Sequence, residues 1–255
     1  MLLQFCSDLH LEFPENAQLL RQHPLQALAP MLILGGDILP FPQFSNFNWF
    51  LDSISDAFEQ VYWIPGNHEY YFDDASRRSG AFFESIRPNV HLCNQFKLEL
   101  DDIDVLLCTL WSNIQPKYRN LIQQRLSDFH VIQYGRQALT PEQYTAMHRS
   151  DMRFLELELE QKGRKSAVIT HHAPTFRQYN PQFQNDPINQ AFGTELRSLI
   201  ELHSPAFWAF GHTHYNPPAF YVGQTAMFTN QLGYVRQGEH KRFNPNLVLN
   251  TSTAL

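Results

Sequence analysis

Short runs of apolar residues recur along the chain, and each run ends sharply in Gly, Pro, Asn, Asp or another polar residue. Such runs are typical of buried strands, because a strand covered on both faces needs no polar positions. Longer segments between several of the runs predict helices, and strands that alternate with helices indicate an α/β architecture. The runs that predict strands are Leu2–Cys6, Met31–Leu34, Val61–Ile64, Val105–Leu107, Ala167–Thr170 and Phe207–Phe210.

Four of the longer segments predict helices. The clearest covers Thr140–Lys162, where Thr140 offers an N-cap side chain and Pro141 suits the first helical position. Gly163 follows this segment and is a common residue just past a helix end. The other three predicted helices are Pro42–Phe58, Ala75–Ile86 and Gln190–Leu202.

The pattern changes after Gly211, where apolar runs follow one another without helices between them. We expect these runs to form an antiparallel sheet that closes the chain. No internal repeat, long low-complexity tract or linker divides the sequence, so we expect one domain over residues 1–255. The runs in question are Ala219–Val222, Ala226–Thr229 and Leu247–Leu249.

Two long stretches have no regular pattern of apolar positions. Ser112–Leu139 is polar and aromatic, and Ala173–Asn189 is rich in Pro, Asn and Gln. Long irregular segments in compact domains are often binding loops, so we expect both stretches to select the substrate and Ala173–Asn189 to be an ordered loop.

The composition is that of a globular protein, with 43% apolar and 17% charged residues. The formal net charge of −6 argues against a groove that follows a long nucleic acid, because such a groove needs clustered Lys and Arg. A small phosphorylated substrate is compatible with this charge, since bound cations would add positive charge that the count omits.

The first residues lack the basic and long apolar segments of a signal peptide, and no apolar run approaches the length of a membrane span. The three cysteines form no CxxC pair, and their odd number suits a reducing compartment. We therefore expect a cytoplasmic protein that does not contact the membrane.

Side chains that can bind metal follow five of the predicted strands. In an α/β sheet the carboxyl ends of parallel strands share one edge, so these side chains are expected to converge there. One such cluster alone is commonly a turn or a helix cap, but five in a charge-poor chain indicate one site. The clusters are Asp8-Leu9-His10, Gly35-Gly36-Asp37, Gly66-Asn67-His68-Glu69, His171-His172 and Gly211-His212-Thr213-His214.

The types of these side chains narrow the choice of metal. Imidazole and carboxylate together suit zinc, manganese or iron better than calcium, which prefers oxygen ligands alone. About seven ligands are too many for one zinc ion, but they suit two ions that share a bridging carboxylate. Two ions about 3.5–4 Å apart are a known arrangement for in-line attack at phosphorus. The sequence therefore predicts a dinuclear metal site.

The motifs Asp-x-His, Gly-Asp, Gly-Asn-His-Glu, His-His-Ala-Pro and Gly-His-Thr-His occur in this order between residues 8 and 214. This series resembles the calcineurin-like metallophosphoesterase superfamily, and the stretch Asn189-Gln190-Ala191-Phe192 is similar to small bacterial members. The resemblance implies an α/β fold, a four-layer α-β-β-α sandwich of two mixed sheets flanked by helices. It also implies a hydrolase, either a phosphatase or a phosphodiesterase.

The same resemblance implies a role for each residue of the motifs. His171 is preferred to His172 as a ligand because it comes first off the strand, as the family's ligand does. His172 would orient a ligand, and Glu69 would orient His68 or a loop, a surface position being an equal alternative for Glu69. The implied ligands are Asp8, His10 and His214 for one ion, Asn67, His171 and His212 for the other, and Asp37 between the two.

The implied reaction is attack on phosphorus by a hydroxide that bridges the metals, with His68 protonating the departing oxygen. We expect a small phosphorylated substrate, such as a nucleotide, and the sequence leaves monoester or diester and the oligomeric state open. Two alternatives are a nuclease acting on short oligonucleotides and a binding scaffold that keeps the fold without the chemistry. Asp128-Phe129-His130 is expected to cap or pack a loop rather than bind metal.

Overall fold

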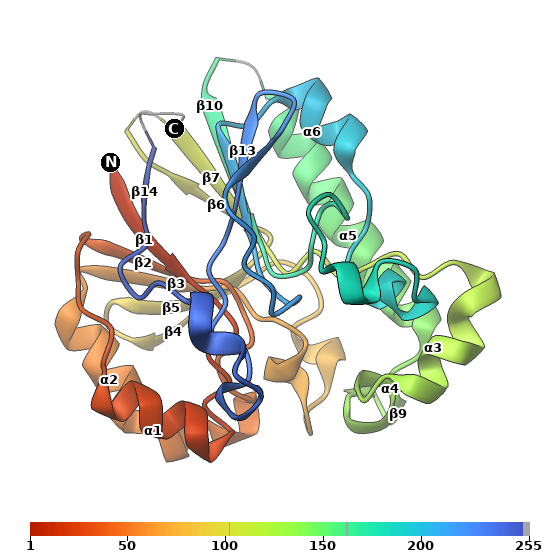
Figure 1. Cartoon of the computed structure of the whole chain (residues 1–255), viewed down its shortest axis with the longest axis horizontal. Coiled ribbons are helices and arrows are strands. Elements are labelled where there is room, and N and C mark those ends of the chain that lie inside the picture. The colour runs from red at the N-terminus through yellow and green to blue at the C-terminus, as the bar shows by residue number, and fades with distance from the viewer. Residues whose placement is uncertain (102, 162, 252–255) are drawn as a thin grey trace.

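The computed structural model describes residues 1–101, 103–161 and 163–251 of the chain (Figure 1). Within these ranges the strands form two six-stranded sheets and one short hairpin, β8–β9 (Gln133–Tyr134 and Gln137–Ala138). The first sheet has the order β14-β1-β2-β3-β5-β4, and the second has the order β12-β13-β11-β10-β7-β6. The strands of the first sheet are β1 (Leu2–Cys6), β2 (Met31–Leu34), β3 (Gln60–Trp63), β4 (Phe82–Arg87), β5 (Val90–Asn94) and β14 (Val248–Asn250). Those of the second are β6 (Phe96–Glu99), β7 (Ile103–Cys108), β10 (Lys165–Thr170), β11 (Phe207–Phe210), β12 (Phe220–Val222) and β13 (Thr225–Thr229).

Both sheets are mixed in the same way. Four neighbouring strands are parallel in each, and an antiparallel strand pairs with each edge of that group. The parallel strands read as continuous apolar runs because both of their faces are buried. In β2, for example, Ile33 faces the core between the two sheets, whereas Leu32 and Leu34 face the helices outside.

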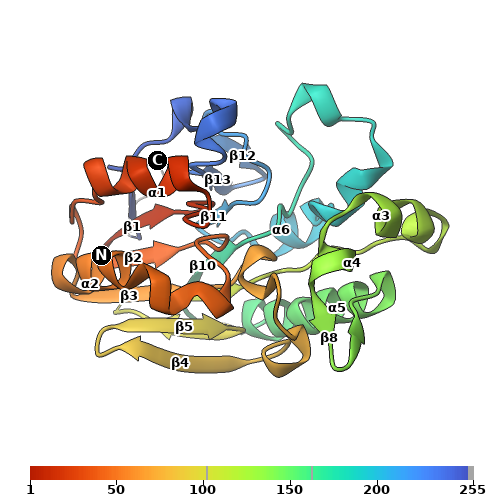
Figure 2. The same ribbon diagram turned by 90° about the horizontal axis from the view of Figure 1, so that it is seen from below.

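Helices cover the outer face of each sheet (Figure 2). Apolar residues of α1 and α2 pack on the first sheet, and those of α5 and α6 pack on the second. The fold is therefore the four-layer α-β-β-α sandwich that the family resemblance implies. The helices are α1 (Pro14–Gln22), α2 (Asn48–Ala57), α3 (Arg119–Arg125), α4 (Asp128–Val131), α5 (Pro141–Leu159) and α6 (Arg197–His203). The 3-10 helices are η1 (Phe41–Phe47), η2 (His68–Tyr70), η3 (Ala75–Arg77), η4 (Pro116–Tyr118), η5 (Pro181–Phe183), η6 (Pro187–Ala191), η7 (Val235–Gln237) and η8 (Glu239–Arg242).

Helix α5 is the helix for which the sequence has the clearest start and stop residues. The Thr140 side chain accepts a hydrogen bond from the backbone N–H of Gln143, and the Gln143 side chain accepts one from the N–H of Thr140. This capping box satisfies two of the backbone donors that a helix start leaves unpaired. The helix ends at Leu159, and Lys162, the last residue of the prediction, lies outside the described residues.

The helix predicted over Ala75–Ile86 is wrong. The structure has only the short η3 there, followed by β4, which pairs antiparallel with β5 at the edge of the first sheet. Side chains of an edge strand face solvent on one side, so they do not form the apolar run that marks a buried strand. The pairing partner, rather than the local pattern, decides this segment.

Three further predictions are corrected in part. The closing antiparallel sheet is instead two sheet edges: β12 pairs antiparallel with β13 in the second sheet, whereas β14 pairs with β1 in the first. β13 itself runs parallel to β11. The helix predicted over Pro42–Phe58 begins as η1 and becomes α2, and the one over Gln190–Leu202 is divided into η6 and α6.

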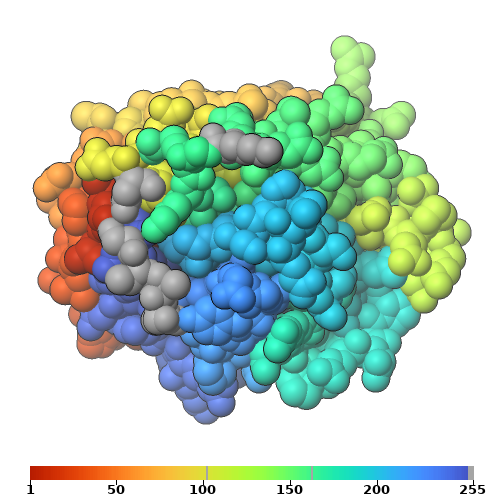
Figure 3. Space-filling model, turned by 90° about the horizontal axis from the view of Figure 1, so that it is seen from above, coloured from red at the N-terminus to blue at the C-terminus, as the bar shows by residue number. Residues whose placement is uncertain are grey.

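The two ends of the molecule hold different parts of the chain. In the space-filling view the N-terminal strands and α2 lie at one end, and the segment that contains α3 lies at the other (Figure 3). Within the described residues no helix is both long enough and apolar enough to cross a membrane. The predicted cytoplasmic location stays a prediction.

Candidate metal centre

Each of the five clusters follows the end of a strand, as the sequence predicts. The structure brings their side chains together at one edge of the sandwich. Asp8 and His10 follow β1, Asp37 follows β2, and Asn67 and His68 follow β3 in the first sheet. The second sheet supplies the remaining members, which follow β10 and β11 and are His171, His212 and His214.

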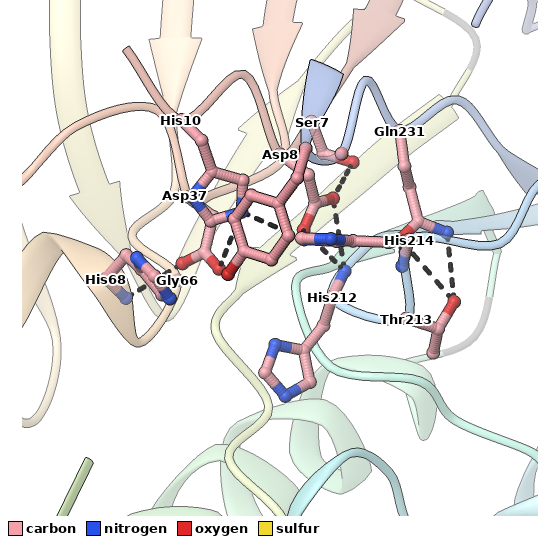
Figure 4. A network of polar contacts seen from close by, with 12 residues as sticks. Ser7, Asp8, His10, Asp37, Gly66, His68, His212, Thr213, His214 and Gln231 are labelled. Carbon is pink, nitrogen blue, oxygen red and sulfur yellow. Dashed lines mark hydrogen bonds and ion pairs between the residues drawn. The ribbon is translucent and has the colours of Figure 1, made fainter. Parts of the chain in front are cut away.

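The first group of side chains is Asp8, His10, Asp37 and His214, whose ligand atoms all lie within 4.8 Å of one another. Nε2 of His10 lies 2.9 Å from Nε2 of His214 and 3.7 Å from Oδ2 of Asp37. Nε2 of His214 also lies 3.4 Å from Oδ1 of Asp8. Figure 4 shows these side chains turned toward one another.

The second group is Asp37, His171 and His212, which meet the same limit of 4.8 Å. Nε2 of His171 lies 3.1 Å from Nδ1 of His212, 3.4 Å from Oδ1 of Asp37 and 3.3 Å from Oδ1 of Asn67. Asp37 is therefore common to both groups, with Oδ2 toward the first and Oδ1 toward the second.

In three of these histidines the hydrogen bond made by Nδ1 shows which ring nitrogen carries the proton. Nδ1 of His10 donates to Glu12, Nδ1 of His214 donates to Glu239, and Nδ1 of His171 donates to the carbonyl of Gly35. These partners only accept, so a neutral ring carries its proton on Nδ1 and a lone pair on Nε2.

Lone pairs that face one another at 2.9 Å repel. Either a second proton on one ring or a metal ion between the rings removes this repulsion. The donor set of imidazole and carboxylate, with each ring fixed by a partner behind it, fits a transition-metal ion or zinc.

Glu12 is a residue of this site that the sequence analysis missed. Its Oε1 accepts hydrogen bonds from Nδ1 of His10 at 3.0 Å and from Nδ1 of His68 at 2.8 Å. Burial acts to raise the pKa of Glu12, but the two histidines outweigh it and lower the pKa to about 2. Glu12 therefore links His10 and His68. Its position two residues after His10 was the available signal.

Glu69 is fully buried, which rules out a surface position, and its hydrogen bonds go to loop backbone and to Trp63 rather than to the His68 ring, as a role in orienting a loop requires. Its carboxylate accepts hydrogen bonds from the backbone N–H groups of Asp37, Ile38 and Gly66, and from the indole of Trp63. Burial, followed by the charge of Asp37, raises the pKa of Glu69 to about 7. Glu69 thus ties together the loops after β2 and β3.

The backbone of the site is strained. A positive φ is uncommon outside glycine and costs roughly 1–3 kcal/mol per residue where the side chain is not favoured there. Such angles gather at functional sites, where the surrounding structure holds them. Five members of the two groups have positive φ, namely Asp8 (56°), His10 (46°), Asp37 (54°), His212 (68°) and His214 (48°).

The model of the calcineurin-like phosphoesterase family matches residues 1–216, which is most of the chain. The chain belongs to this family. It is accordingly a phosphoesterase enzyme, and its general activity is metal-dependent hydrolysis of phosphoesters. The resemblance drawn from the sequence motifs is confirmed.

Two proteins are similar to this phosphoesterase, one in sequence and the other in structure. The uncharacterized protein L509 of Acanthamoeba polyphaga mimivirus is 30% identical over 272 residues, which cover 96% of this chain and 94% of the relative. The crystal structure of phosphopantetheinyl hydrolase (PptH) from Mycobacterium tuberculosis has a TM-score of 0.69 with 16% identity, over 94% of this chain and 92% of that one. At that identity the similarity to PptH shows a shared fold.

Asp128 also belongs to the surroundings of the phosphoesterase site. Its Oδ1 accepts hydrogen bonds from Nδ2 of Asn67 at 3.0 Å and from the Tyr71 hydroxyl at 2.9 Å. The bond from Nδ2 fixes the Asn67 amide with its oxygen toward His171. Asp128 begins α4 and belongs to neither group of metal-binding side chains among the described residues, and nothing local in the sequence indicates its contact with Asn67.

His172 points away from the two groups. Its Nε2 lies 2.8 Å from the hydroxyl of Tyr144, and its Nδ1 lies 3.3 Å from the carbonyl of Thr109. The His172 ring packs against the His212 ring, with 4.2 Å between their centroids. His172 thus supports a member of the second group by packing, whereas His171 belongs to that group.

A cavity of about 400 Å³ opens onto both groups of the phosphoesterase. His68 lies in its wall, where its ring stacks on the ring of Tyr71 at 4.0 Å. The two stretches that have no regular pattern in the sequence, Ser112–Leu139 and Ala173–Asn189, both contribute to the wall. They are therefore placed where a substrate would contact them.

Proposed function

We propose that this phosphoesterase hydrolyses mono- or diesters of phosphate in small molecules, using two metal ions side by side. The observation that carries the proposal is Asp37, whose two carboxylate oxygens face two separate sets of histidine nitrogens. One carboxylate between two sets of ligands is the arrangement that a dinuclear centre needs.

The proposed ligand sets follow from the two groups. Asn67 joins the second set through its amide oxygen, which lies 3.3 Å from Nε2 of His171 and is held by Asp128. When bound, the ions would lower the pKa of water to near ~7 and offset negative charge on the phosphoryl oxygens. The first set is Asp8, His10, Asp37 and His214, and the second is Asp37, Asn67, His171 and His212.

His68 is the proposed general acid. Its Nδ1 is bonded to Glu12, which leaves Nε2 as the nitrogen that holds a proton for the departing oxygen. The carboxylate of Glu12 would stabilise the charged ring and fix its orientation. The backbone N–H of His68 donates to Oδ1 of Asp37 at 2.8 Å, which keeps the ring beside the shared carboxylate.

The proposal is tested by reconstitution. Metal-free protein is loaded with Mn, Zn or Fe, its metal content is measured, and its turnover is followed on several classes of phosphoester. The panel contains an aryl monoester, an aryl diester, cyclic and linear nucleotides, a short oligonucleotide and, because of the structural similarity to PptH, a phosphopantetheinyl ester. We expect two ions per chain and turnover of at least one small ester.

Other outcomes have definite meanings. Full activity with one ion per chain would contradict the dinuclear proposal. Turnover of the oligonucleotide alone would favour the nuclease, and no turnover with any metal would favour the scaffold.

The His68→Ala variant tests the acid. We expect metal content to persist while turnover falls by about 100-fold or more on esters with poor leaving groups, and by less on esters with good ones. His23→Ala is the matched control, because His23 is exposed and lies outside the cavity. Unchanged turnover in His68→Ala would remove this residue from the mechanism.

A further inference from the structure

The part of the cavity beyond the metal centre is built from two loops that are far apart in the sequence. One loop follows β7 and contains α3, and the other joins β10 to α6. The cavity is continuous with the metal centre, because Asp37, Asn67 and His212 line it as well. Its remaining wall is largely apolar and aromatic, formed by Leu126, Tyr179, Phe183, Ile188 and Phe192 of the two loops, together with Tyr234, which follows β13.

Arg125 is the only Lys or Arg among the described residues that line this cavity. Its guanidinium forms a two-fold hydrogen-bonded ion pair with Asp186, at 3.0 Å from Nη1 to Oδ1 and 2.9 Å from Nη2 to Oδ2. Oδ1 of Asp186 also accepts the backbone N–H of Ile188 at 3.0 Å. The charge of Arg125 is therefore neutralised by the carboxylate of Asp186, which a backbone N–H of the loop between β10 and α6 holds in place.

The other charged groups of the wall are acidic. Asp128 is engaged by Asn67 and Tyr71, and Glu239 accepts Nδ1 of His214 at 2.8 Å and the N–H of Tyr234 at 2.7 Å. With Arg125 and Asp186 cancelling, the wall beyond the metals carries no unpaired positive charge among the described residues and an excess of carboxylates. A second anionic group on a substrate would find no unpaired cation there.

We propose that the two-loop wall selects phosphoesters whose part outside the reacting phosphate is uncharged and largely apolar, and that Asp186 sets this selection by neutralising Arg125. The inference rests on the proposed function, since it concerns the substrate of that same site. It excludes bisphosphates, polyphosphates and esters with a distal carboxylate as preferred substrates.

The test compares substrates that differ in one charge. Two aryl phosphates are used, one with a para carboxymethyl group and the other with its para carbamoylmethyl isostere, so that size and leaving group are closely matched. The same two aryl groups are also used in diesters that share a nitrophenyl leaving group. For the wild type we expect kcat/KM to be about tenfold higher or more for the carbamoyl member of each pair that is turned over.

Two variants are then expected to move this ratio in opposite directions. Asp186→Asn leaves Arg125 uncompensated, and we expect the carbamoyl-to-carboxylate ratio of kcat/KM to fall by about tenfold. Arg125→Gln leaves Asp186 uncompensated, and the ratio should rise. Glu142→Gln is the matched control for Asp186→Asn: Glu142 pairs with Arg119 at 3.0 Å, is exposed and lies outside the cavity, and its neutralisation changes the net charge by the same single positive unit.

The outcomes separate the two proposals. No metal-dependent turnover of any ester overturns both. Turnover with an equal or higher rate for the carboxylate member overturns this inference and leaves the proposed function standing. The same conclusion follows if Asp186→Asn and Arg125→Gln shift the ratio no more than Glu142→Gln does. Because the two cavity variants are expected to move the ratio in opposite directions, loss of folding in one of them still leaves the other as a test.

Discussion

Gly66 illustrates how closely the residues of the metal centre are packed. A Cβ atom built on Gly66 would lie 2.2 Å from Oδ1 of Asp37 and 2.6 Å from Nε2 of His171. Both neighbours are fixed, Asp37 by its place after β2 and His171 by its bond to the carbonyl of Gly35. Only hydrogen fits at this position, so the Gly of the Gly-Asn-His-Glu motif is needed for space.

The Gly66→Ala variant is therefore expected to displace the shared carboxylate or the His171 ring. A displacement of about 1 Å can cost about 100-fold in rate, and we expect a loss of at least this size together with lower metal content. Gly80→Ala is the control, because a Cβ there meets nothing within 4 Å. Metal analysis and steady-state kinetics of both variants measure the effect, and wild-type values for Gly66→Ala would contradict the tight packing described.

The residues of the centre differ in how far the sequence reveals them. Asp37 and Asn67 stand directly after apolar runs, and the shared edge of parallel strands then explains why they meet. Asp128 comes from a loop distant in sequence, and nothing local marks it as the partner of Asn67. Glu12 sits close to His10, but its contact with His68 joins residues that are 56 positions apart, and the sequence does not indicate it.

At the scale of elements, α5 shows why some segments are predictable. Its cap signals are local, and its buried side chains recur at helical spacing, so pattern and structure agree. β4 lacks such signals because its conformation depends on pairing with β5.

α5 also carries a buried titratable group toward the loop after β7: Nδ1 of His148 donates to the carbonyl of Trp111.

This docking of α5 predicts a dependence of stability on pH. Burial lowers the pKa of His148 to about 4, so the unfolded chain takes up a proton below about pH 6.5 and the folded chain does not. The contribution is intact above that pH and is lost as the pH falls toward 4. Between pH 7 and pH 5 the loss is about 2 kcal/mol by linkage.

The measurement is the free energy of unfolding of the wild type and of His148→Asn, by chemical denaturation at both pH values. The wild type should lead by a margin that shrinks by about 2 kcal/mol at the lower pH. A margin that is the same at both values would show that His148 is not buried in its neutral form.

At the scale of the whole molecule, the metal centre lies at the edge of the sandwich where strand ends of the two sheets meet. Removal of the ions leaves facing nitrogens and strained backbone at this junction, so bound metal should stabilise the entire fold. A ligand that binds only the native state at about 100 times its Kd adds about 2.7 kcal/mol. For a chain of this size we expect a chelator to lower Tm by about 5–10 °C.

Thermal denaturation with chelator, and again after addition of Zn or Mn, measures this effect. The Asp37→Asn variant serves as the comparison and should respond weakly, because it lacks the carboxylate that both groups share. An equal response in wild type and variant would place the effect of the chelator elsewhere.

That the chain forms one domain over residues 1–255 stays a prediction.

Because the centre takes its ligands from strand ends of both sheets, its position also decides when it can form during synthesis of the chain. Asp8, Asp37 and Asn67 belong to the half of the chain that is made first, whereas His171, His212 and His214 follow strands of the other half. A ribosome that has released only the first five strands, β1 to β5, has therefore made a chain with an incomplete set of ligands. β14 pairs with β1 only after that, when the end of the chain returns to its beginning. With the proposed ligand set, catalytic competence is expected only late in synthesis, and we expect nascent or truncated chains to be inert toward the phosphoesters around them.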